Sequence, residues 1–164
     1  MSPIDLLLQQ IDLAYDRRSW HGTNLRGSIR GLTPDAAAWR PGKGRHNIHE
    51  LVVHCAYWKY TVTRRLTGAK RGSFPLKGSN WFARSEADAA LWKGDLALLE
   101  DCHRQLRATI AALSPKALVR TSAGNRPDHE VVSGIVAHDL YHAGQIQLVK
   151  VLFAARNAER GTRN

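Results

Sequence analysis

The chain has 164 residues, a length typical of one domain that buries its core without disulfides or a structural metal. Hydrophobic residues make up 43% and charged residues 23%, as in soluble globular proteins, and no uncharged apolar run is long enough to cross a membrane. The two cysteines are expected to be buried and unpaired. The formal net charge is +10, but the basic residues are scattered and do not alternate with aromatic residues in one block. Nucleic-acid binding is therefore not expected, although this charge does not exclude it.

The first residues predict a cytoplasmic protein that begins with a helix. Residues 1–5, Met-Ser-Pro-Ile-Asp, contain neither the basic segment nor the apolar core of a signal peptide. Ser2 can cap a helix, Pro3 suits the first helical position, and Asp5 falls in the first turn, where the helix dipole favours an anion. Apolar residues then recur at helical spacing, so we expect this helix to run to about residue 30 and to end at Gly31.

A second long helix is expected after a short helical turn over residues 32–39. Asn47 can cap this second helix, and Glu50 occupies the capping-box position three residues later. Gly68 is its expected end, because glycine adopts the left-handed conformation that commonly terminates a helix.

Two more long helices complete the expected fold. The third should begin at Ser85 and end before Pro115, and the fourth should begin at Asp128 as its cap. The basic residues 156–164 are predicted to form a frayed tail. No stretch alternates apolar and polar residues long enough to predict a strand. The chain is therefore predicted to be one all-α domain over residues 1–164, a four-helix bundle with a long loop between its second and third helices.

The connection over residues 68–84 is long for a compact domain and contains Phe74, Trp81 and Phe82. Loops of this length are often lids or binding loops. The alternative is a flexible loop whose aromatic residues only attach it to the core. Trp81 and Lys77 are therefore candidate substrate-loop residues.

A weak internal repeat relates the two halves of the chain. The string Leu-Thr-Pro-Asp-Ala at residues 32–36 matches Leu-Ser-Pro-Lys-Ala at residues 113–117, and each precedes a polar loop and a long helix. This alignment makes His54 and His138 equivalent positions. Packing of duplicated units about a pseudo-two-fold axis would bring these two histidines together, whereas chance recurrence of a common helix-start signal is the alternative.

Three histidines on apolar helical stripes are the strongest site candidates. His138 and His142 are four residues apart and share one face of a helix, and His54 lies on the apolar face of the second long helix. The repeat places Trp58 where His142 stands in the other half. An unpartnered buried polar group costs about 1–3 kcal/mol, so these imidazoles need partners. One metal ion would satisfy all three and leave a position open for water or substrate, and separate hydrogen bonds in the core are the alternative.

The sequence His-Asp-Leu-Tyr-His-Ala-Gly-Gln, which begins at His138, resembles the DinB-like superfamily, as does the position of His54 near the start of its helix. This superfamily includes bacillithiol- and mycothiol-dependent transferases and YfiT-like metal hydrolases. The Leu-Thr-Pro-x-x-x-x-Trp segment that begins at Leu32 extends the resemblance over nearly the whole chain. The resemblance implies a four-helix bundle, a homodimer and a divalent metal, zinc or nickel, bound to His54, His138 and His142.

Other residues are weaker candidates. Trp58 lies one turn beyond His54 and could line the pocket floor, while Asp139 adjoins a ligand but points about 100° away from it on an ideal helix. Tyr141 and Glu50 are further candidates around the pocket. The remaining histidines are expected at the pocket mouth, at helix ends or on the surface, each at most singly hydrogen-bonded: His21, His46, His49, His103 and His129.

Two reactions suit a three-histidine metal centre. A metal-bound thiol can attack an electrophile as the thiolate at neutral pH, or the metal can ionise water for hydrolysis of an amide or ester. Hydrolysis needs a general base, and neither Glu50, Glu130 nor Asp139 is in an obvious position for it. We therefore favour transfer of a low-molecular-weight thiol to a small-molecule electrophile over hydrolysis or a non-catalytic bundle that binds metal or nucleic acid. Three basic loop residues could attract an anionic thiol: Lys43, Arg45 and Lys77.

Overall fold

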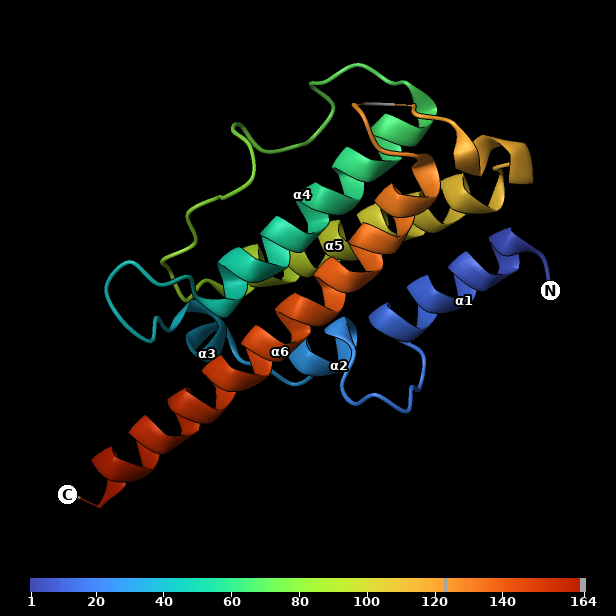
Figure 1. The fold of residues 1–164 in the computed structure, drawn as a ribbon. Helices are drawn as coiled ribbons and strands as arrows, with labels where there is room; N and C mark the ends of the chain where they lie inside the picture. The colour runs from blue at the N-terminus through green and yellow to red at the C-terminus, as the bar shows by residue number, and fades with distance from the viewer. Residues whose placement is uncertain (123, 163–164) are drawn as a thin grey trace.

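The computed structural model describes residues 1–122 and 124–162, and all regular elements in that part of the chain are helical. Figure 1 shows a bundle of four long helices: α1 (Pro3–Tyr15), α4 (Ile48–Thr67), α5 (Ala89–Ala111) and α6 (Asp128–Gly161). Three short elements connect them: α2 (Leu25–Ile29), α3 (Pro34–Ala38) and the 3-10 helix η1 (Pro115–Val119). The predicted all-α four-helix bundle is confirmed. Within these residues, each helix lacks either the length or the apolar character that a membrane span requires.

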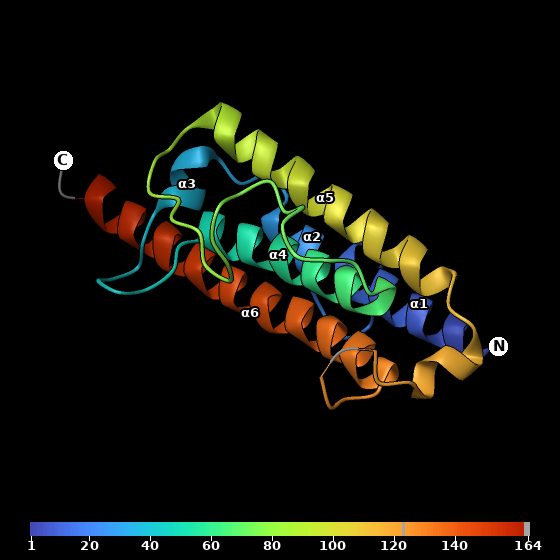
Figure 2. The ribbon, with the colours of Figure 1, turned by 90° about the horizontal axis from the view of Figure 1, so that it is seen from above.

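The direction of the helices explains the long loop. In Figures 1 and 2, α4 and α5 point the same way, whereas α1 and α6 point the opposite way. A tight turn cannot join two helices that run in parallel, so residues 68–88 return along the length of α4 before α5 begins. We call residues 68–88 the crossover loop. The topology therefore carries this loop past the face of α4 on which His54 lies.

Helix α1 is shorter than predicted. It ends at Tyr15, and Gly22 then adopts a φ of 113°, a conformation outside any helix. Asn24 caps the separate helix α2 by accepting a backbone N–H of its first turn at 2.8 Å. The apolar spacing continues into Leu25 and Ile29 because both segments bury residues in the same core. Periodicity alone therefore merged two helices into one.

Two of the predicted helix signals around α4 and α5 are confirmed, and one is wrong. The side chain of Asn47 accepts the backbone N–H of Glu50 at 2.8 Å, and Gly68 ends α4 with a φ of 72°. Helix α5 begins at Ala89 and not at Ser85. Its cap is Asp88, whose carboxylate accepts a backbone N–H of the first turn at 2.9 Å.

Helix α6 also differs from its prediction at both ends. Asp128 is its first residue and not its cap, because the carboxylate of Asp128 accepts the hydroxyl of Ser122 at 2.6 Å and Pro127 occupies the cap position. The helix continues to Gly161, so the predicted tail is helical up to that residue. The last part of that prediction, residues 163–164, lies outside the described residues.

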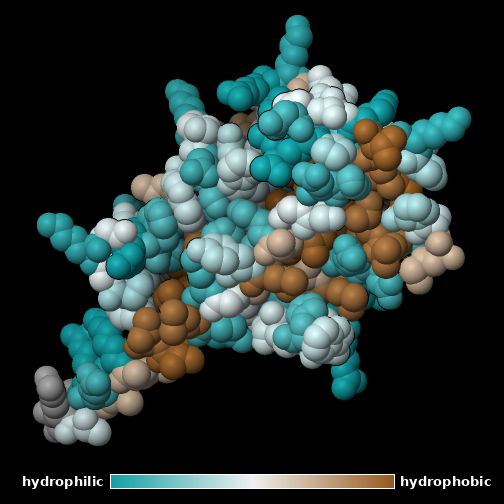
Figure 3. Space-filling view, viewed as in Figure 1, coloured by the Kyte–Doolittle hydropathy of each residue, from teal (hydrophilic) through white to brown (hydrophobic). Residues whose placement is uncertain are grey.

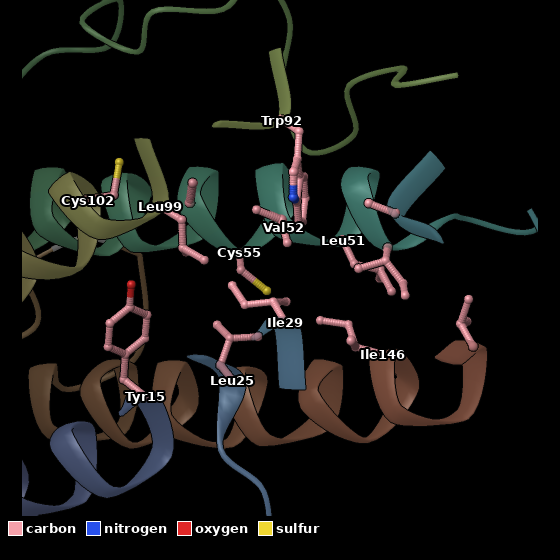
Figure 4. Packing of buried hydrophobic residues seen from close by; sticks show 14 residues of the cluster. Tyr15, Leu25, Ile29, Leu51, Val52, Cys55, Trp92, Leu99, Cys102 and Ile146 are labelled. Atoms are coloured by element: carbon pink, nitrogen blue, oxygen red, sulfur yellow. The ribbon is translucent and has the colours of Figure 1, made fainter. Parts of the chain in front are cut away.

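The core surrounds α4. Leu51, Val52 and Cys55 of α4 pack with Leu99 of α5 and Ile146 of α6, all at most 4% exposed (Figure 4). Burial of such side chains stabilises the fold by about 1.5–3 kcal/mol each. Both cysteines are buried and free, as predicted. With α4 fixed between its neighbours, the side chains that face α6 from α4 are held in defined positions.

Candidate metal centre

Three histidine side chains meet between α4 and α6. The Nε2 atom of His138 lies 3.1 Å from Nε2 of His54 and 3.2 Å from Nε2 of His142. His54 and His142 are about 95% buried, and His138 is half-buried. The four-residue spacing aligns His138 and His142 on one face of α6, and the neighbouring helix α4 supplies His54. The structure therefore brings together the three residues that the sequence nominated.

The other ring nitrogen of two of these histidines has a fixed partner. Nδ1 of His54 donates to the backbone carbonyl of Asn80 at 2.8 Å, and Nδ1 of His142 donates to Oε1 of Gln145 at 2.7 Å. A neutral imidazole carries one N–H, so the Nε2 atoms of both rings present lone pairs. Nδ1 of His138 is buried without a hydrogen-bond partner among the described residues.

Burial keeps all three rings neutral. It lowers the pKa of His138 to about 3, with further lowering by the neighbouring His142 and His54. Burial also lowers the pKa of His142 to about 4, against a smaller opposing effect of its hydrogen bond to Gln145. The pKa of His54 is lowered for the same reason, and its bond to Asn80 opposes that effect. Neutral imidazole is the form that binds a metal ion.

The spacing of the three nitrogens fits one metal ion. Two nitrogens that bind the same tetrahedral zinc ion at 2.0–2.1 Å are about 3.3 Å apart. The distances of 3.1 and 3.2 Å from His138 to its neighbours are close to that value. A single N–H of His138 cannot satisfy the lone pairs of both neighbours equally. A cation between the rings would satisfy all three lone pairs, and an imidazole set of this kind suits zinc or nickel.

The crossover loop holds one of these histidines in place. Asn80 accepts from His54 through its backbone carbonyl and from Nε1 of Trp58 through its side chain at 2.9 Å. It is the one residue other than glycine with a positive φ, 65°, among the described residues. Asparagine tolerates this left-handed conformation better than most residues. One loop residue thus orients a candidate ligand and is itself anchored to α4.

Trp81 covers the outer face of His54. The indole stacks on the His54 ring at 3.8 Å with an interplanar angle of 8°, and on its other face it stacks on His46 at 3.6 Å. Phe82, the next residue, is buried against Phe74. The two interpretations of the loop, a binding loop and a loop that its aromatic residues attach to the core, therefore apply to different residues. Phe82 and Phe74 attach the loop to the core, and Trp81 forms part of the candidate site.

A cavity of about 540 Å³ opens beside His142, and we call it the metal-side cavity. Its size is in the range of small-molecule sites. The crossover loop contributes Trp81, and the segment before α4 contributes Arg45 and His46. Helices α4 and α6 contribute apolar and polar residues to its walls: Leu51, Tyr141, Gln145, Leu148, Val149 and Leu152. No aspartate or glutamate lies among the described residues that line it.

Glu50, a predicted pocket candidate, does not face the histidines. Arg40 donates to both of its carboxylate oxygens, at 2.6 and 2.9 Å, and His46 contacts it at 2.8 Å. Burial alone would raise the pKa of Glu50, but the hydrogen bonds from Arg40 and His46 outweigh burial and hold that pKa below its usual value. Glu50 therefore orients His46.

Asp139 lies beside His138 but is engaged in an ion pair inside the bundle. Its carboxylate pairs with Lys59 of α4, which is completely buried. Cys55, Asp139 and one nitrogen of His138 form a second group within 4.8 Å, and Lys59 supplies the positive charge of that group. Burial raises the pKa of Asp139, and Lys59 opposes this effect. Asp139 therefore belongs to an internal ion pair beside the candidate ligands.

The remaining predicted pocket residues are distributed over two sides of the crossover loop. Tyr141 lines the metal-side cavity and is 64% exposed. Trp58 lies with its ring centroid 6.3 Å from that of His54. Arg45 lines the metal-side cavity, whereas Lys77 lines a different cavity on the other side of the loop, and Lys43 lines neither.

Two of the other histidines differ from the prediction. His49 is 1% exposed and bonds to Asp95 at 2.8 Å, and His103 is 5% exposed and stacks on Tyr15 at 3.5 Å. Both face the core because the adjoining helices bury those faces. His46 lies at the cavity mouth, as predicted, and the last two are exposed: His21 and His129.

The sequence did not identify Asn80, Gln145 or Lys59 as part of the site. Gln145 carried a usable signal, because it follows His142 by three residues and so shares its face of the helix. Lys59 follows the buried Cys55 by four residues on α4, so the same spacing indicates that Lys59 shares a buried helix face with Cys55. Asn80 lies in an irregular loop, so no periodic pattern could have indicated its contact with His54.

The fold and the three rings together define a helical-bundle protein with a histidine centre suited to one divalent metal ion. A family model described as the DinB superfamily matches residues 17–146. The chain therefore belongs to the DinB superfamily. A search of the curated proteins and a search of the solved structures each found no match.

Proposed function

We propose that this protein is a metal-dependent enzyme that transfers a low-molecular-weight thiol to an electrophilic small molecule. The observation that carries the proposal is a neutral three-histidine centre beside a cavity whose described lining contains no carboxylate. A divalent transition metal, zinc or nickel, held by His54, His138 and His142 would supply the Lewis acidity that lowers the pKa of a thiol or, in the alternative reaction, of water.

The position of His46 favours thiol transfer over hydrolysis. A general base for water must lie within hydrogen-bond reach of that water, directly or through one further water. Besides His142 and Arg45, the described lining of the cavity contains two titratable side chains, Tyr141 and His46, and the indole of Trp81 stacks on both the His46 ring and the His54 ring. With stacking distances of 3.6 and 3.8 Å to these two rings, Trp81 lies against both His46 and His54, which disfavours direct activation of water at the histidine centre by His46.

His46 can still move a proton at the mouth of the cavity. Glu50 is held ionised by Arg40 and accepts from Nδ1 of His46, so Nε2 of His46 is left as a proton acceptor. In thiol transfer, the sulfur bonds to the electrophilic carbon and the leaving group departs with the electron pair of its former bond. The thiol proton passes to solvent at the mouth of the cavity, where Nε2 of His46 can accept it.

The walls of the cavity suit organic reactants. Apolar side chains of α4 and α6 offer an apolar surface for an electrophile, while Arg45 offers a positive charge for an acidic thiol. Hydrolysis of an amide or ester remains the alternative reaction, and a bundle that binds metal without catalysis is the alternative of another class.

Two measurements test the proposal. Elemental analysis of the purified protein should find close to one transition-metal ion per chain, and the double variant His138→Ala/His142→Ala should lose it. The intact protein should then consume chlorodinitrobenzene with bacillithiol, mycothiol or glutathione, forming a carbon–sulfur bond and releasing chloride. Turnover of p-nitrophenyl acetate without any thiol would favour hydrolysis instead, and a metal-free protein of unchanged stability would refute the metal centre.

We also propose that a second copy of the chain covers the exposed face of α6. Four large apolar residues of this helix are more than 40% exposed: Tyr141, Leu148, Val151 and Leu152. Figure 3 shows apolar surface over the C-terminal half of α6, which extends beyond the other helices in Figure 1. Three of the four residues also line the metal-side cavity, so a self-complementary contact here would add a wall to that cavity.

Light scattering after size-exclusion chromatography tests the dimer. Leu148→Glu places a charge in the centre of the apolar face and should give a monomer. Leu6→Glu on α1, at a leucine that is 47% exposed, is the matched control and should leave the dimer intact. A wild-type chain that is monomeric at 100 µM would contradict this contact.

A further inference from the structure

A second cavity, of about 590 Å³, lies between α4 and the crossover loop, and we call it the loop-side cavity. Figures 1 and 2 show the loop running beside the C-terminal half of α4, where this cavity lies. Asn80 lines it, whereas the next residue, Trp81, lines the metal-side cavity. The same stretch of chain therefore separates two cavities that differ in their chemistry.

Positive charge dominates the loop-side cavity. Arg64 and Arg65 of α4 line it together with Arg71 and Lys77 of the loop, and no aspartate or glutamate lies among its described lining residues. Throughout residues 1–122 and 124–162, none of these four cations has a carboxylate within 4.0 Å. Four cations around one concave surface attract anions more strongly than the same charges dispersed over a convex one.

Stabilisation of the helix end accounts for only part of this charge. Arg64 and Arg65 lie in the last turn of α4, where the helix dipole favours cations. Arg65 also lies over the ring of Trp58, 5.9 Å from its centroid. Arg71 and Lys77 belong to no helix and have no such role. Their charges converge on the cavity without a partner in the described chain.

Aromatic rings form another wall of the same cavity. Tyr57, Tyr60 and Phe74 line it and pack against one another with ring centroids 5.3–6.2 Å apart. Each of the three is only half-buried, so ring surface remains available to a ligand. Aromatic faces of this kind stack on the flat rings of bound molecules.

We propose that the loop-side cavity binds a small organic polyanion that carries phosphate or carboxylate groups and a flat ring. Its charged groups lie between Arg64, Arg71 and Lys77, and its ring lies against Tyr60 and Phe74. This proposal does not depend on the thiol-transfer reaction. It adds a second ligand to the protein, held on the opposite side of the loop residue that orients His54.

Occupancy of this cavity bears on the metal centre through Asn80. The Asn80 side chain bonds to Trp58, which lines the same cavity, and the Asn80 carbonyl bonds to His54. A ligand that bridges α4 and the loop holds these two elements together. Bound ligand should therefore restrain residues 70–80 as well as neutralise their charge.

Isothermal titration calorimetry of the full-length protein with its metal, in 0.15 M salt, tests the proposal. Pyrophosphate and citrate probe phosphate and carboxylate charge, and adenosine triphosphate adds a flat ring. We expect the nucleotide to bind more tightly than pyrophosphate. Arg71→Gln should weaken nucleotide binding about tenfold, and Arg64→Gln/Arg71→Gln about a hundredfold, as expected for lost charged hydrogen bonds.

Lys70→Gln is the matched control. It removes the same charge from the same loop at a residue outside the cavity lining, so it should change affinity less than twofold. At a nucleotide concentration between the dissociation constants of the wild type and of Arg71→Gln, nucleotide should also slow tryptic cleavage after Lys77 in the wild type and in Lys70→Gln more than in Arg71→Gln. Arg71 is exposed in a loop, so its substitution leaves the fold intact.

Several results would overturn the proposal. Equal weakening by Lys70→Gln would show a general effect of the basic surface, and binding that disappears on metal removal but survives Arg71→Gln would place the anion at the histidines. Tighter binding of a short single-stranded oligonucleotide than of the nucleotide would make the ligand a nucleic acid. None of these results changes the expected metal content or thiol transfer, so the two proposals fail separately.

Discussion

The buried ion pair between Lys59 and Asp139 gives the sharpest test of how this bundle is stabilised. Lys59 is 0% exposed and Asp139 is 2% exposed, and the Lys59 ammonium also lies 5.0 Å from the ring centroid of Tyr15. Each charge compensates the other in a region that water does not reach. Replacement of one partner should therefore cost more than replacement of both.

The variant Lys59→Met removes the cation and keeps the volume of the side chain. It leaves Asp139 as an uncompensated buried carboxylate, which should lower the free energy of unfolding by about 3–5 kcal/mol. For a domain of this size, that loss lowers the melting temperature by about 6–20 °C. The double variant Lys59→Met/Asp139→Leu has no buried charge at this position, and its stability should return to within about 1 kcal/mol of the wild type or exceed it.

Urea denaturation followed by circular dichroism measures these differences, with a chelator present because bound metal would add stability of its own. Burial raises the folded-state pKa of Asp139, and removal of Lys59 raises that pKa further. A raised carboxyl pKa contributes stability that is lost as pH rises, so the deficit of Lys59→Met relative to the wild type should be larger at pH 8 than at pH 5. Lys93→Met, at an exposed lysine of α5, is the control. A deficit below about 1 kcal/mol for Lys59→Met, or a double variant no more stable than the single one, would refute the reasoning.

Two further predictions concern buried histidine chemistry. Burial lowers the pKa of His103 to about 3, so this residue contributes stability above pH 6.5 that is lost as pH falls towards 3. Between pH 7.5 and pH 5, the free energy of unfolding of His103→Phe should therefore fall by up to about 2 kcal/mol less than that of the wild type in urea titrations. An unchanged pH dependence would contradict this. Gln145→Leu removes the acceptor for Nδ1 of His142 and should weaken metal binding about 10–100-fold in a competition with a chromogenic chelator, whereas Gln147→Leu, which loses only a contact with Thr23, should bind metal as the wild type does.

The residues predictable from the sequence are those whose positions depend on helical periodicity. His138 and His142 had to share a face of α6, and the apolar stripe of α4 put His54 on an inward face. The same reasoning failed between Tyr15 and Leu25, where the apolar spacing continued across a break in the helix. Periodicity identifies which face is buried but does not detect an interruption that keeps the same face inward.

The contacts that complete the site depend on tertiary structure. Asn80 and Trp81 reach His54 because α4 and α5 run in parallel and the loop must return along α4. Nothing in the sequence from Gly68 to Arg84 specifies that path. The pairing of Lys59 with Asp139 likewise depends on the relative placement of α4 and α6, which are far apart in the sequence.

The weak internal repeat relates the one histidine that α4 contributes to the candidate centre to the two that α6 contributes. The repeat makes His54 and His138 equivalent, and the antiparallel packing of α4 and α6 brings their Nε2 atoms to 3.1 Å. One turn further along, α6 carries His142 and α4 carries Trp58 at the matching position. His142 adds the third nitrogen, while Nε1 of Trp58 donates to the side chain of Asn80, the loop residue that orients His54. A substitution of Trp58 would remove this anchor of the loop. The difference between the two halves therefore gives the candidate centre three nitrogens and gives the loop its anchor on α4.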